Sequence, residues 1–286
     1  MASKSIIDAS FKPAFKAWIA LWYLFYVLLR VALRLTIGKA RRQYVQDILG
    51  LHYSRAYNAI YGDFLGRHHE PHIRKIIKQH LRNGGVFIDV GAYLGYFSNY
   101  AYQLVRRKGG LVIAVEPDPE NHSVLLRERV SNEIEVVNAA IWVKDGTVNL
   151  RRGKSRHSAR HLSSERVSDS STLVITQHHK ERNLLSNELV SVNSIRLDTL
   201  IKQFNLRQVD LVKMDIEGAE YYVLTDPGLD LSKVKAMVVE VHYSFTSPQS
   251  KTIISSLKSK GFKLYPFFIQ DKRRYHLYAV KTGQKS

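Results

Sequence analysis

Cysteine is absent from this chain of 286 residues. Without thiols the protein forms no disulfide, no zinc–thiolate site, no iron–sulfur cluster and no cysteine nucleophile. Proline and glycine are not abundant, at 7 and 16 residues, while hydrophobic residues make up 45% and charged residues 24% of the chain. This is the composition of an ordinary globular protein, so it excludes collagen-like, mucin-like and globally disordered chains.

Acidic residues are scarce relative to basic ones: 25 Asp and Glu face 43 Lys and Arg, which gives a formal net charge of +18. Such a balance indicates an anionic partner, which is a nucleic acid, an anionic membrane surface or a phosphorylated substrate. The excess is spread along the chain, whereas a nucleic-acid enzyme more often carries one dense basic stripe. We therefore favour contact with a membrane or a glycolipid over contact with nucleic acid.

One apolar run near the N-terminus, AWIALWYLFYVLL from Ala17 to Leu29, contains no charge. It is shorter than the about 20 residues of a membrane span, and its Trp and Tyr side chains suit the headgroup region. We expect residues 13–37 to form a helix that lies on or dips into the membrane, with a cytoplasmic body beyond it. The alternatives are a short span with snorkelling arginines, and a helix packed on the protein's own core or on a partner.

Three regions are predicted: the apolar helix within residues 1–37, a helical connector over 38–83, and an α/β domain over 84–286. The connector contains His68, His69, His72 and His80 beside Glu70 and Pro71. A metal site would need supporting acids in fixed geometry, so we predict a solvated loop there and no metal. Within the α/β domain, residues 151–187 form a polar insertion rich in Ser, Arg and His, with one short strand candidate, TLVIT.

The α/β domain alternates short apolar runs with helical segments. VFIDV, LVIAVEP and IEVVNAAIWV are candidate buried strands, and the segments between the first and second and between the second and third read as helices. This βαβαβ pattern predicts a parallel, doubly wound sheet. Asp145-Gly146 predicts a hairpin turn. Further strands are predicted at Val209–Met214 and KAMVVEVHYS, and a helix is predicted over residues 248–260. FKLYPFF and YHLYAVK predict a final antiparallel hairpin.

Acids and glycines follow the first two strands, at the sheet edge where doubly wound folds bind ligands. Asp89 precedes Gly91 and Gly95, and Glu116 ends the second strand, where a carboxylate can accept hydrogen bonds from ribose hydroxyls. The glycine spacing is not the G-x-G-x-x-G of dinucleotide sites. Because an acid near the loop repels a pyrophosphate and suits a sulfonium or an amine, the charge favours S-adenosylmethionine over NAD.

Six ordered blocks resemble the FkbM family of methyltransferases over about residues 84–245: VFIDVGAYLGYFS, LVIAVEPDPEN, VNAAI, RLDTL, VDLVKMDIEGAEYYVL and VVEVH. The resemblance implies a class I methyltransferase (Rossmann-like) fold. This fold has a seven-stranded, mostly parallel sheet, helices on both faces and an antiparallel final hairpin. It also implies S-adenosyl-L-methionine as cofactor and O-methylation of a hydroxyl on a sugar, a glycolipid or a related metabolite. Neither the first 70 residues nor the insertion is covered by the resemblance, and the acceptor is not implied.

Carried over by position, the resemblance implies donor contacts by residues of the loop after the first strand and of the ends of the second and third, namely Asp89, Gly91, Ala92, Gly95, Glu116, Pro117, Asn138 and Ala139. Asp215 is the preferred general base, with His242 beside Glu240 as the second candidate. Lys213 and Glu217 are expected on the acceptor side, and Glu220 as a dipole-matched acid of the next helix. A divalent metal at Asp215, Glu240 and His242 is the less favoured alternative.

Other functions fit parts of this pattern. An RNA methyltransferase would share the fold and suit the basic charge, but the chain has no obvious added RNA-binding module. A membrane-attached scaffold without activity would not need the acids at 89, 116 and 215. A nicotinamide oxidoreductase lacks its glycine motif and a Tyr-x-x-x-Lys. We therefore predict a cytoplasmic, membrane-associated methyltransferase that acts on a hydroxyl-bearing small molecule or lipid-linked glycan.

Overall fold

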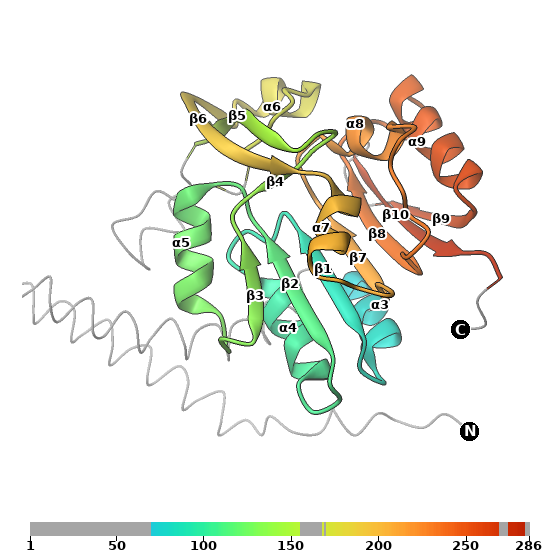
Figure 1. The fold of residues 1–286 in the computed structure, drawn as a ribbon. Coiled ribbons are helices and arrows are strands. Elements are labelled where there is room, and N and C mark those ends of the chain that lie inside the picture. The colour runs from blue at the N-terminus through green and yellow to red at the C-terminus, as the bar shows by residue number, and fades with distance from the viewer. Residues whose placement is uncertain (1–69, 155–167, 169, 269–273, 284–286) are drawn as a thin grey trace, which may run out of the picture. The chain divides into compact units, whose positions relative to one another are not determined.

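The computed structural model describes residues 70–154, 168, 170–268 and 274–283, which form an α/β fold around one large sheet (Figure 1). The sheet has seven strands in the order β3-β2-β1-β7-β8-β10-β9. The strands are β1 (Val86–Val90), β2 (Leu111–Val115), β3 (Ile134–Val137), β7 (Leu211–Met214), β8 (Ala236–Val241), β9 (Phe262–Phe268) and β10 (Tyr275–Lys281). This is the order and number of strands of a class I methyltransferase.

The first five strands are parallel, and the last two form the antiparallel hairpin expected from the sequence. β7 is the middle strand of the seven, and its Lys213 is in register with Asp89 of the neighbouring β1. Strand order reverses beside β1, since β2 and β3 follow on one side and β7 and β8 on the other. The carboxyl ends of β1, β2 and β7 therefore share the edge at which such sheets bind ligands.

Helices cover both faces of the large sheet because each strand buries apolar side chains on both sides. α3 (Pro71–Leu81), α4 (Tyr96–Val105) and α5 (Pro119–Glu128) pack with Phe87, Val112 and Leu211 in one core. α7 (Leu197–Gln203), α8 (Glu220–Thr225) and α9 (Pro248–Ser259) pack with Ile88 and Val212 in the other. Successive side chains of a strand point to opposite faces of the sheet, so Asp89 points to the same face as Phe87, the face that α4 covers. Lys213, in register with Asp89, points to that face as well.

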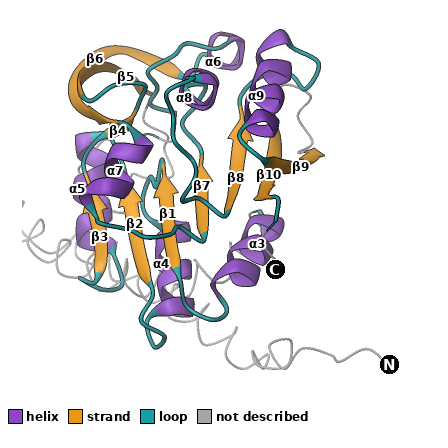
Figure 2. Cartoon of the chain, turned by 45° about the vertical axis from the view of Figure 1, so that its right-hand side comes forward, coloured by secondary structure: helices purple, strands orange, loops and turns teal. Residues whose placement is uncertain are grey.

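A second, three-stranded sheet lies above the carboxyl edge of the first (Figure 2). Its order is β4-β6-β5, from β4 (Ala140–Ile141), β5 (Gly146–Gly153) and β6 (Leu185–Ile195). The insertion thus begins and ends in β-strands of this sheet, and α6 (Gln177–Arg182) is the helix found in its described part. TLVIT is not a strand; Thr172 makes a single antiparallel bridge to Arg151.

Two local predictions around residues 134–150 are wrong. The run IEVVNAAIWV divides between the two sheets after Val137, where the Asn138 amide donates to the carbonyls of Glu116 and Pro117 and so redirects the chain. β4 and β5 do not pair with each other, since β6 lies between them. The Asp145 carboxylate accepts instead from the backbone N–H of Arg196 and from Thr199, at the start of α7.

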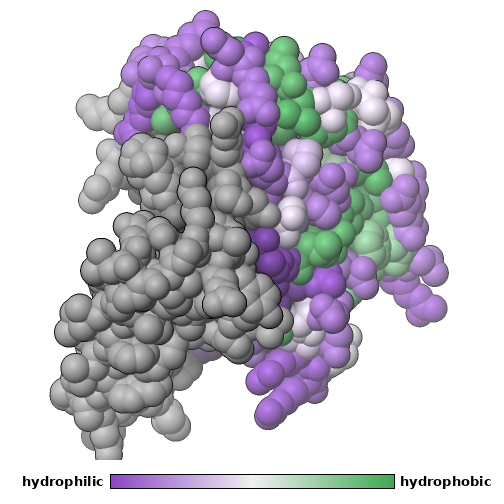
Figure 3. Space-filling view, turned by 90° about the vertical axis from the view of Figure 1, so that its left-hand side faces the viewer, coloured by the Kyte–Doolittle hydropathy of each residue, from purple (hydrophilic) through white to green (hydrophobic). Residues whose placement is uncertain are grey.

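The expected membrane helix at 13–37 lies outside the described residues. Over residues 70–154, 170–268 and 274–283, none of the helices is both long and apolar enough to cross a bilayer. One described face shows hydrophilic residues around smaller groups of hydrophobic ones (Figure 3). Such a mixture is usual at protein surfaces and indicates no particular partner.

Candidate functional site

A cavity of about 370 Å³ opens at the carboxyl edge of the large sheet. The loop after β1, the end of β2 and the start of β4 line one part of it. We call this part the donor end, because the residues expected to contact the methyl donor lie there. The end of β7, Glu240 of β8 and Arg274 line another part, which we call the acid end. The insertion contributes Ser168, Ser170, Ser171, Thr172, Leu173, Arg182 and Leu184 to the wall.

The loop after β1 approaches the neighbouring strand too closely for any side chain at Gly91. Gly91 has φ +72°, and a Cβ there would lie 1.8 Å from the Asp215 carbonyl oxygen. Gly95, with φ +80°, begins α4 at its N-cap, so the loop leaves the first backbone N–H groups of that helix at the same edge. Both glycines are therefore required by the backbone path, and Gly91 and Ala92 line the cavity.

Glu116 is buried at the end of β2 and lines the donor end. Its Oε2 accepts from the backbone N–H of Tyr93 at 2.8 Å, and its Oε1 accepts from the N–H of Asp118 and from the Asn121 amide, both at 3.1 Å. Burial raises the pKa of Glu116 to about 7 in spite of these hydrogen bonds. A carboxylate has about four lone-pair positions, so three bonds leave capacity for one further donor.

The insertion is anchored beside Glu116 by buried polar contacts. The Asn121 amide donates to the Ser168 carbonyl at 2.7 Å, and the Ser168 N–H donates back to Asn121 at 3.0 Å. Arg152 of β5, itself buried, donates to Asp118 at 2.9 Å and to Glu120 at 2.7 Å. The neighbouring carboxylates outweigh burial and raise the pKa of Arg152, so this guanidinium is a permanent cation. The insertion therefore forms part of the donor end, which the sequence did not indicate.

Lys213 connects the two ends of the cavity. Its ammonium donates to the Gly91 carbonyl at 3.1 Å and lies 3.5 Å from Asp89 Oδ1 and 3.7 Å from Asp215 Oδ2. Asp89 also accepts from the Ser98 hydroxyl at 2.7 Å and does not line the cavity. Burial would lower the pKa of Lys213, but Asp89 and Asp215 outweigh it and raise that pKa.

Residues 215–220, here called the acid block, form a tight turn between β7 and α8. Asp215 and Glu217 line the cavity, while Glu220 is buried and accepts from the N–H groups of Ile216 and Gly218. Burial, followed by the Glu240 carboxylate, raises the pKa of Asp215 to about 8. Asp215 can therefore take up a proton near neutral pH.

His242 lies behind the acid block and does not line the cavity. Its Nδ1 is 3.0 Å from Glu220 Oε1, and its Nε2 is 3.4 Å from Glu217 Oε2 and 3.9 Å from Asp215 Oδ1. Burial would lower the pKa of His242, but Glu217 and Glu220 outweigh it and raise that pKa well above the usual value. His242 thus places positive charge next to Asp215.

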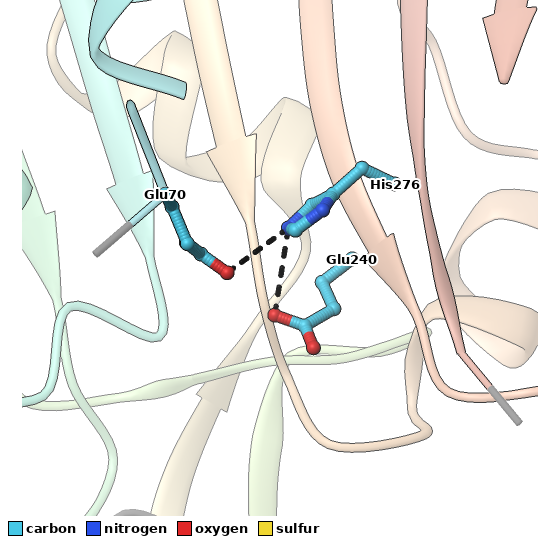
Figure 4. Close-up of side chains that lie close together, drawn as sticks. All are labelled: Glu70, Glu240 and His276. Carbon is cyan, nitrogen blue, oxygen red and sulfur yellow. Dashed lines mark ion pairs between the residues drawn. The ribbon is translucent and has the colours of Figure 1, made fainter. Parts of the chain in front are cut away.

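Glu70, Glu240 and His276 lie close together (Figure 4), and of these Glu70 and Glu240 line the cavity. His276 Nε2 lies 3.4 Å from Glu70 Oε1 and 3.6 Å from Glu240 Oε2. Arg274 donates to Glu240 Oε1 at 2.7 Å. The ligand atoms of this trio, and those of Asp215, Glu240 and His242, are close enough to share a metal ion. In both groups the Arg274 cation already pairs with Glu240, so we assign no metal.

The structure brings most of the predicted site residues to one cavity. Among the donor residues Gly91, Ala92, Glu116, Pro117 and Ala139 line it, and so do Lys213, Asp215, Glu217 and Glu240. Four predicted residues do not line the cavity and instead contact residues that do: Asp89, Gly95, Asn138 and His242. The sequence did not point to Tyr93, Asn121, Arg152 or His179; only the high content of Arg, Ser and His in the insertion hinted at buried polar contacts.

The strand order, the glycine loop and the acids at the carboxyl edge define a class I methyltransferase. The family model "Methyltransferase FkbM domain" matches residues 89–264. The chain therefore belongs to the FkbM methyltransferase family, as the sequence blocks predicted, and it is an S-adenosylmethionine-dependent methyltransferase. The donor end fits this cofactor, because the backbone of Gly91 and Ala92 lines the cavity and Glu116 beside it retains capacity for one hydrogen bond.

Among curated proteins, the chain is similar to the AMB antimetabolite synthetase AmbE of Pseudomonas aeruginosa, with 34% identity over 97 residues. The match covers 31% of this chain and 4% of AmbE, so the chain spans a small part of that protein's length.

Solved structures resemble the chain more distantly. The FkbM methyltransferase of Methylobacillus flagellatus KT has 13% identity and a TM-score of 0.41, covering 69% of this chain and 44% of that one. A putative rRNA-methylase of Clostridium thermocellum has 8% identity and a TM-score of 0.44, covering 75% and 96%. Aeropyrum pernix fibrillarin, crystallised with natively bound S-adenosyl-L-methionine, has 14% identity and a TM-score of 0.39, covering 70% and 68%.

Proposed function

We propose that this methyltransferase O-methylates a hydroxyl group of a sugar, a glycolipid or a related metabolite at the cytoplasmic side of a membrane. The observation that carries the proposal is the acid end of the cavity, where Glu70, Asp215, Glu217 and Glu240 present carboxylates. Carboxylates accept hydrogen bonds from hydroxyl groups, so a polyhydroxylated acceptor suits this wall.

Asp215 is the proposed general base. When bound, S-adenosylmethionine supplies an electrophilic methyl group on a sulfonium. Asp215, with a pKa raised to about 8, would take the proton of the acceptor hydroxyl, whose oxygen would take the methyl group with release of the thioether S-adenosylhomocysteine. Lys213 and His242 place positive charge within 4 Å of the Asp215 carboxylate and keep it oriented. Positioning the hydroxyl in line with the methyl group supplies much of the remaining rate.

The donor end is proposed to hold the cofactor through Glu116 and the loop after β1. Glu116 would accept a hydrogen bond from a ribose hydroxyl, and Pro117, Ala139 and Ile141, which line the wall there, would hold the adenine. Gly91 and the acid block would then hold the methionine part. Asp89 holds Lys213, and Lys213 in turn holds the Gly91 carbonyl, so both act as positioning residues.

Membrane contact is proposed from the sequence of residues 13–37, with their uncharged aromatic run and flanking basic residues. Attachment there would bring the cavity near lipid-linked hydroxyl acceptors. The basic charge of the chain would strengthen contact with anionic headgroups.

The test is transfer of a radiolabelled methyl group from S-adenosylmethionine to fractionated membrane lipids, soluble sugars and RNA. We expect label in a sugar-containing fraction, stable to mild base as an ether is and an ester is not. Asp215→Asn should lower this transfer at least about 100-fold, because it removes the base, and change S-adenosylhomocysteine affinity less than about threefold. Label in RNA, or full transfer by Asp215→Asn, would overturn the proposal.

A further inference from the structure

We propose that His179, a residue of the insertion, is a positioning residue for the acid block: it holds the Glu217 carboxylate against His242 and so fixes the charge that faces Asp215. The inference deepens the proposed function and rests on it. It concerns a residue that touches neither the cavity nor the reacting atoms, since His179 is buried behind Glu217.

The hydrogen bonds of His179 determine which ring nitrogen carries the proton. The backbone N–H of Thr176 donates to His179 Nδ1 at 3.1 Å, so Nδ1 is an acceptor. A neutral imidazole with an acceptor at Nδ1 carries its proton at Nε2. His179 Nε2 lies 3.1 Å from Glu217 Oε2 and therefore donates to that carboxylate. The N-terminal turn of α6 thus sets the tautomer that Glu217 needs.

Glu217 is held in a backbone conformation that it would not adopt by itself. Its φ is +53°, in the left-handed region that side chains other than glycine rarely occupy, and Gly218 follows at φ +102°. The Thr172 hydroxyl donates to the Glu217 carbonyl at 2.7 Å. A Cβ at Gly218 would lie 2.3 Å from Thr176 Cγ2, so the insertion packs directly on this turn. Strain of this kind persists only where neighbouring structure enforces it.

The result is a chain of charged and polar groups that leads from the insertion to the proposed base. Glu217 Oε2 lies between two imidazoles, 3.1 Å from His179 and 3.4 Å from His242. His242 is faced by four carboxylates, those of Asp215, Glu217, Glu220 and Glu240. Among these, Glu217 is the one that the insertion controls. Losing His179 frees Glu217 to turn into the cavity, toward Lys213 or the acceptor, and weakens the charge that His242 presents to Asp215.

A purely structural role would leave a different signature. If His179 only stabilises the first turn of α6 through Thr176, its loss lowers thermal stability but leaves the environment of His242 unchanged. If His179 positions Glu217, its loss changes the titration of His242, and a side chain that still donates a hydrogen bond restores it. Glutamine is such a side chain, because its amide N–H groups can reach the carboxylate.

The experiment uses the full chain with ¹⁵N-labelled histidine, and compares the wild type with His179→Ala, His179→Gln and the control Lys180→Ala, an exposed neighbour on α6. NMR follows the His242 ring with pH, and calorimetry measures binding of S-adenosylhomocysteine. We expect the His242 midpoint to fall by about one pH unit or more in His179→Ala, and to stay near the wild-type value in His179→Gln and Lys180→Ala. We expect S-adenosylhomocysteine affinity to change less than about threefold in all three variants.

An unchanged His242 midpoint in a folded His179→Ala variant would overturn the inference. The wild type offers a second measurement if that variant does not fold: the His179 ring should show a proton at Nε2 and none at Nδ1, and a proton at Nδ1 would overturn the inference as well. Failure of the wild type to bind S-adenosylhomocysteine would instead contradict the proposed function. The two failures are therefore distinguishable.

Discussion

Replacement of Glu116 by glutamine tests the donor end directly. Glu116 is buried, accepts three hydrogen bonds from the protein and has capacity for one from a ribose hydroxyl. Glutamine has the same shape but exchanges one carboxylate oxygen for an NH₂ group. That group must face either the Tyr93 N–H or the donors from Asp118 and Asn121, and the charged acceptor is lost in both orientations.

The expected loss follows from the strength of one charged hydrogen bond, about 1.5–3 kcal/mol. Since 1.4 kcal/mol is tenfold, S-adenosylhomocysteine should bind roughly 10- to 150-fold more weakly to Glu116→Gln. Isothermal titration calorimetry measures this change. The exposed Glu135 of β3 provides the matched control, and Glu135→Gln should bind like the wild type.

The pH dependence provides an independent readout of the same group. The ionised carboxylate is the form that accepts from ribose, and burial raises the pKa of Glu116 to about 7. Affinity should therefore rise with pH through this value, about tenfold between pH 6 and pH 8, as the ionised fraction increases from about one tenth to about nine tenths. Glu116→Gln should lose this component. Equal affinity of variant and wild type, with the same pH profile, would refute the role of Glu116.

Three further changes test the backbone, the insertion and the membrane segment. Gly91→Ala should lower the free energy of unfolding by more than about 2 kcal/mol, because the new Cβ meets the Asp215 carbonyl. Gly109 is also at positive φ but has open space around it, so Gly109→Ala should lower the free energy of unfolding by only about 1 kcal/mol. Arg152→Ala should destabilise the protein by about 3–5 kcal/mol by leaving Asp118 buried without its cation, whereas Arg151→Ala should cost much less; urea denaturation checks both pairs. In the full chain, Leu24→Lys with Val27→Lys should abolish flotation with anionic liposomes, and wild-type protein that does not float would contradict membrane contact.

Much of the fold follows from local signals in the sequence. The buried strands β1 and β2 are short runs, apolar except for Asp89, and each begins directly after a glycine; parallel strands place their carboxyl ends at one edge. The positions of Gly91, Glu116 and Asp215 around one cavity could therefore be predicted without coordinates. The final antiparallel hairpin could also be predicted from local signals, because two apolar runs flank a short charged turn.

The insertion could not be predicted in this way because its contacts are polar and distant in sequence. Arg152 and His179 belong to a Ser-, Arg- and His-rich stretch without periodicity, and nothing local shows that one meets Asp118 and the other Glu217. Asp145-Gly146 has the composition of a hairpin turn, yet the Asp145 carboxylate bonds to residues at the start of α7. In each case a tertiary hydrogen bond decides the local structure.

The most direct test of the account is a crystal structure of the full chain with S-adenosylhomocysteine. The account predicts the ribose on Glu116, the adenine between Pro117 and Ile141, and the sulfur facing Asp215 at the acid end. It also predicts that Ser168 and Asn121, which are hydrogen-bonded to each other beside Glu116, lie next to the ribose. A ligand bound elsewhere, or bound in the cavity with its sulfur directed away from Asp215, would contradict the assignment of both ends of the site.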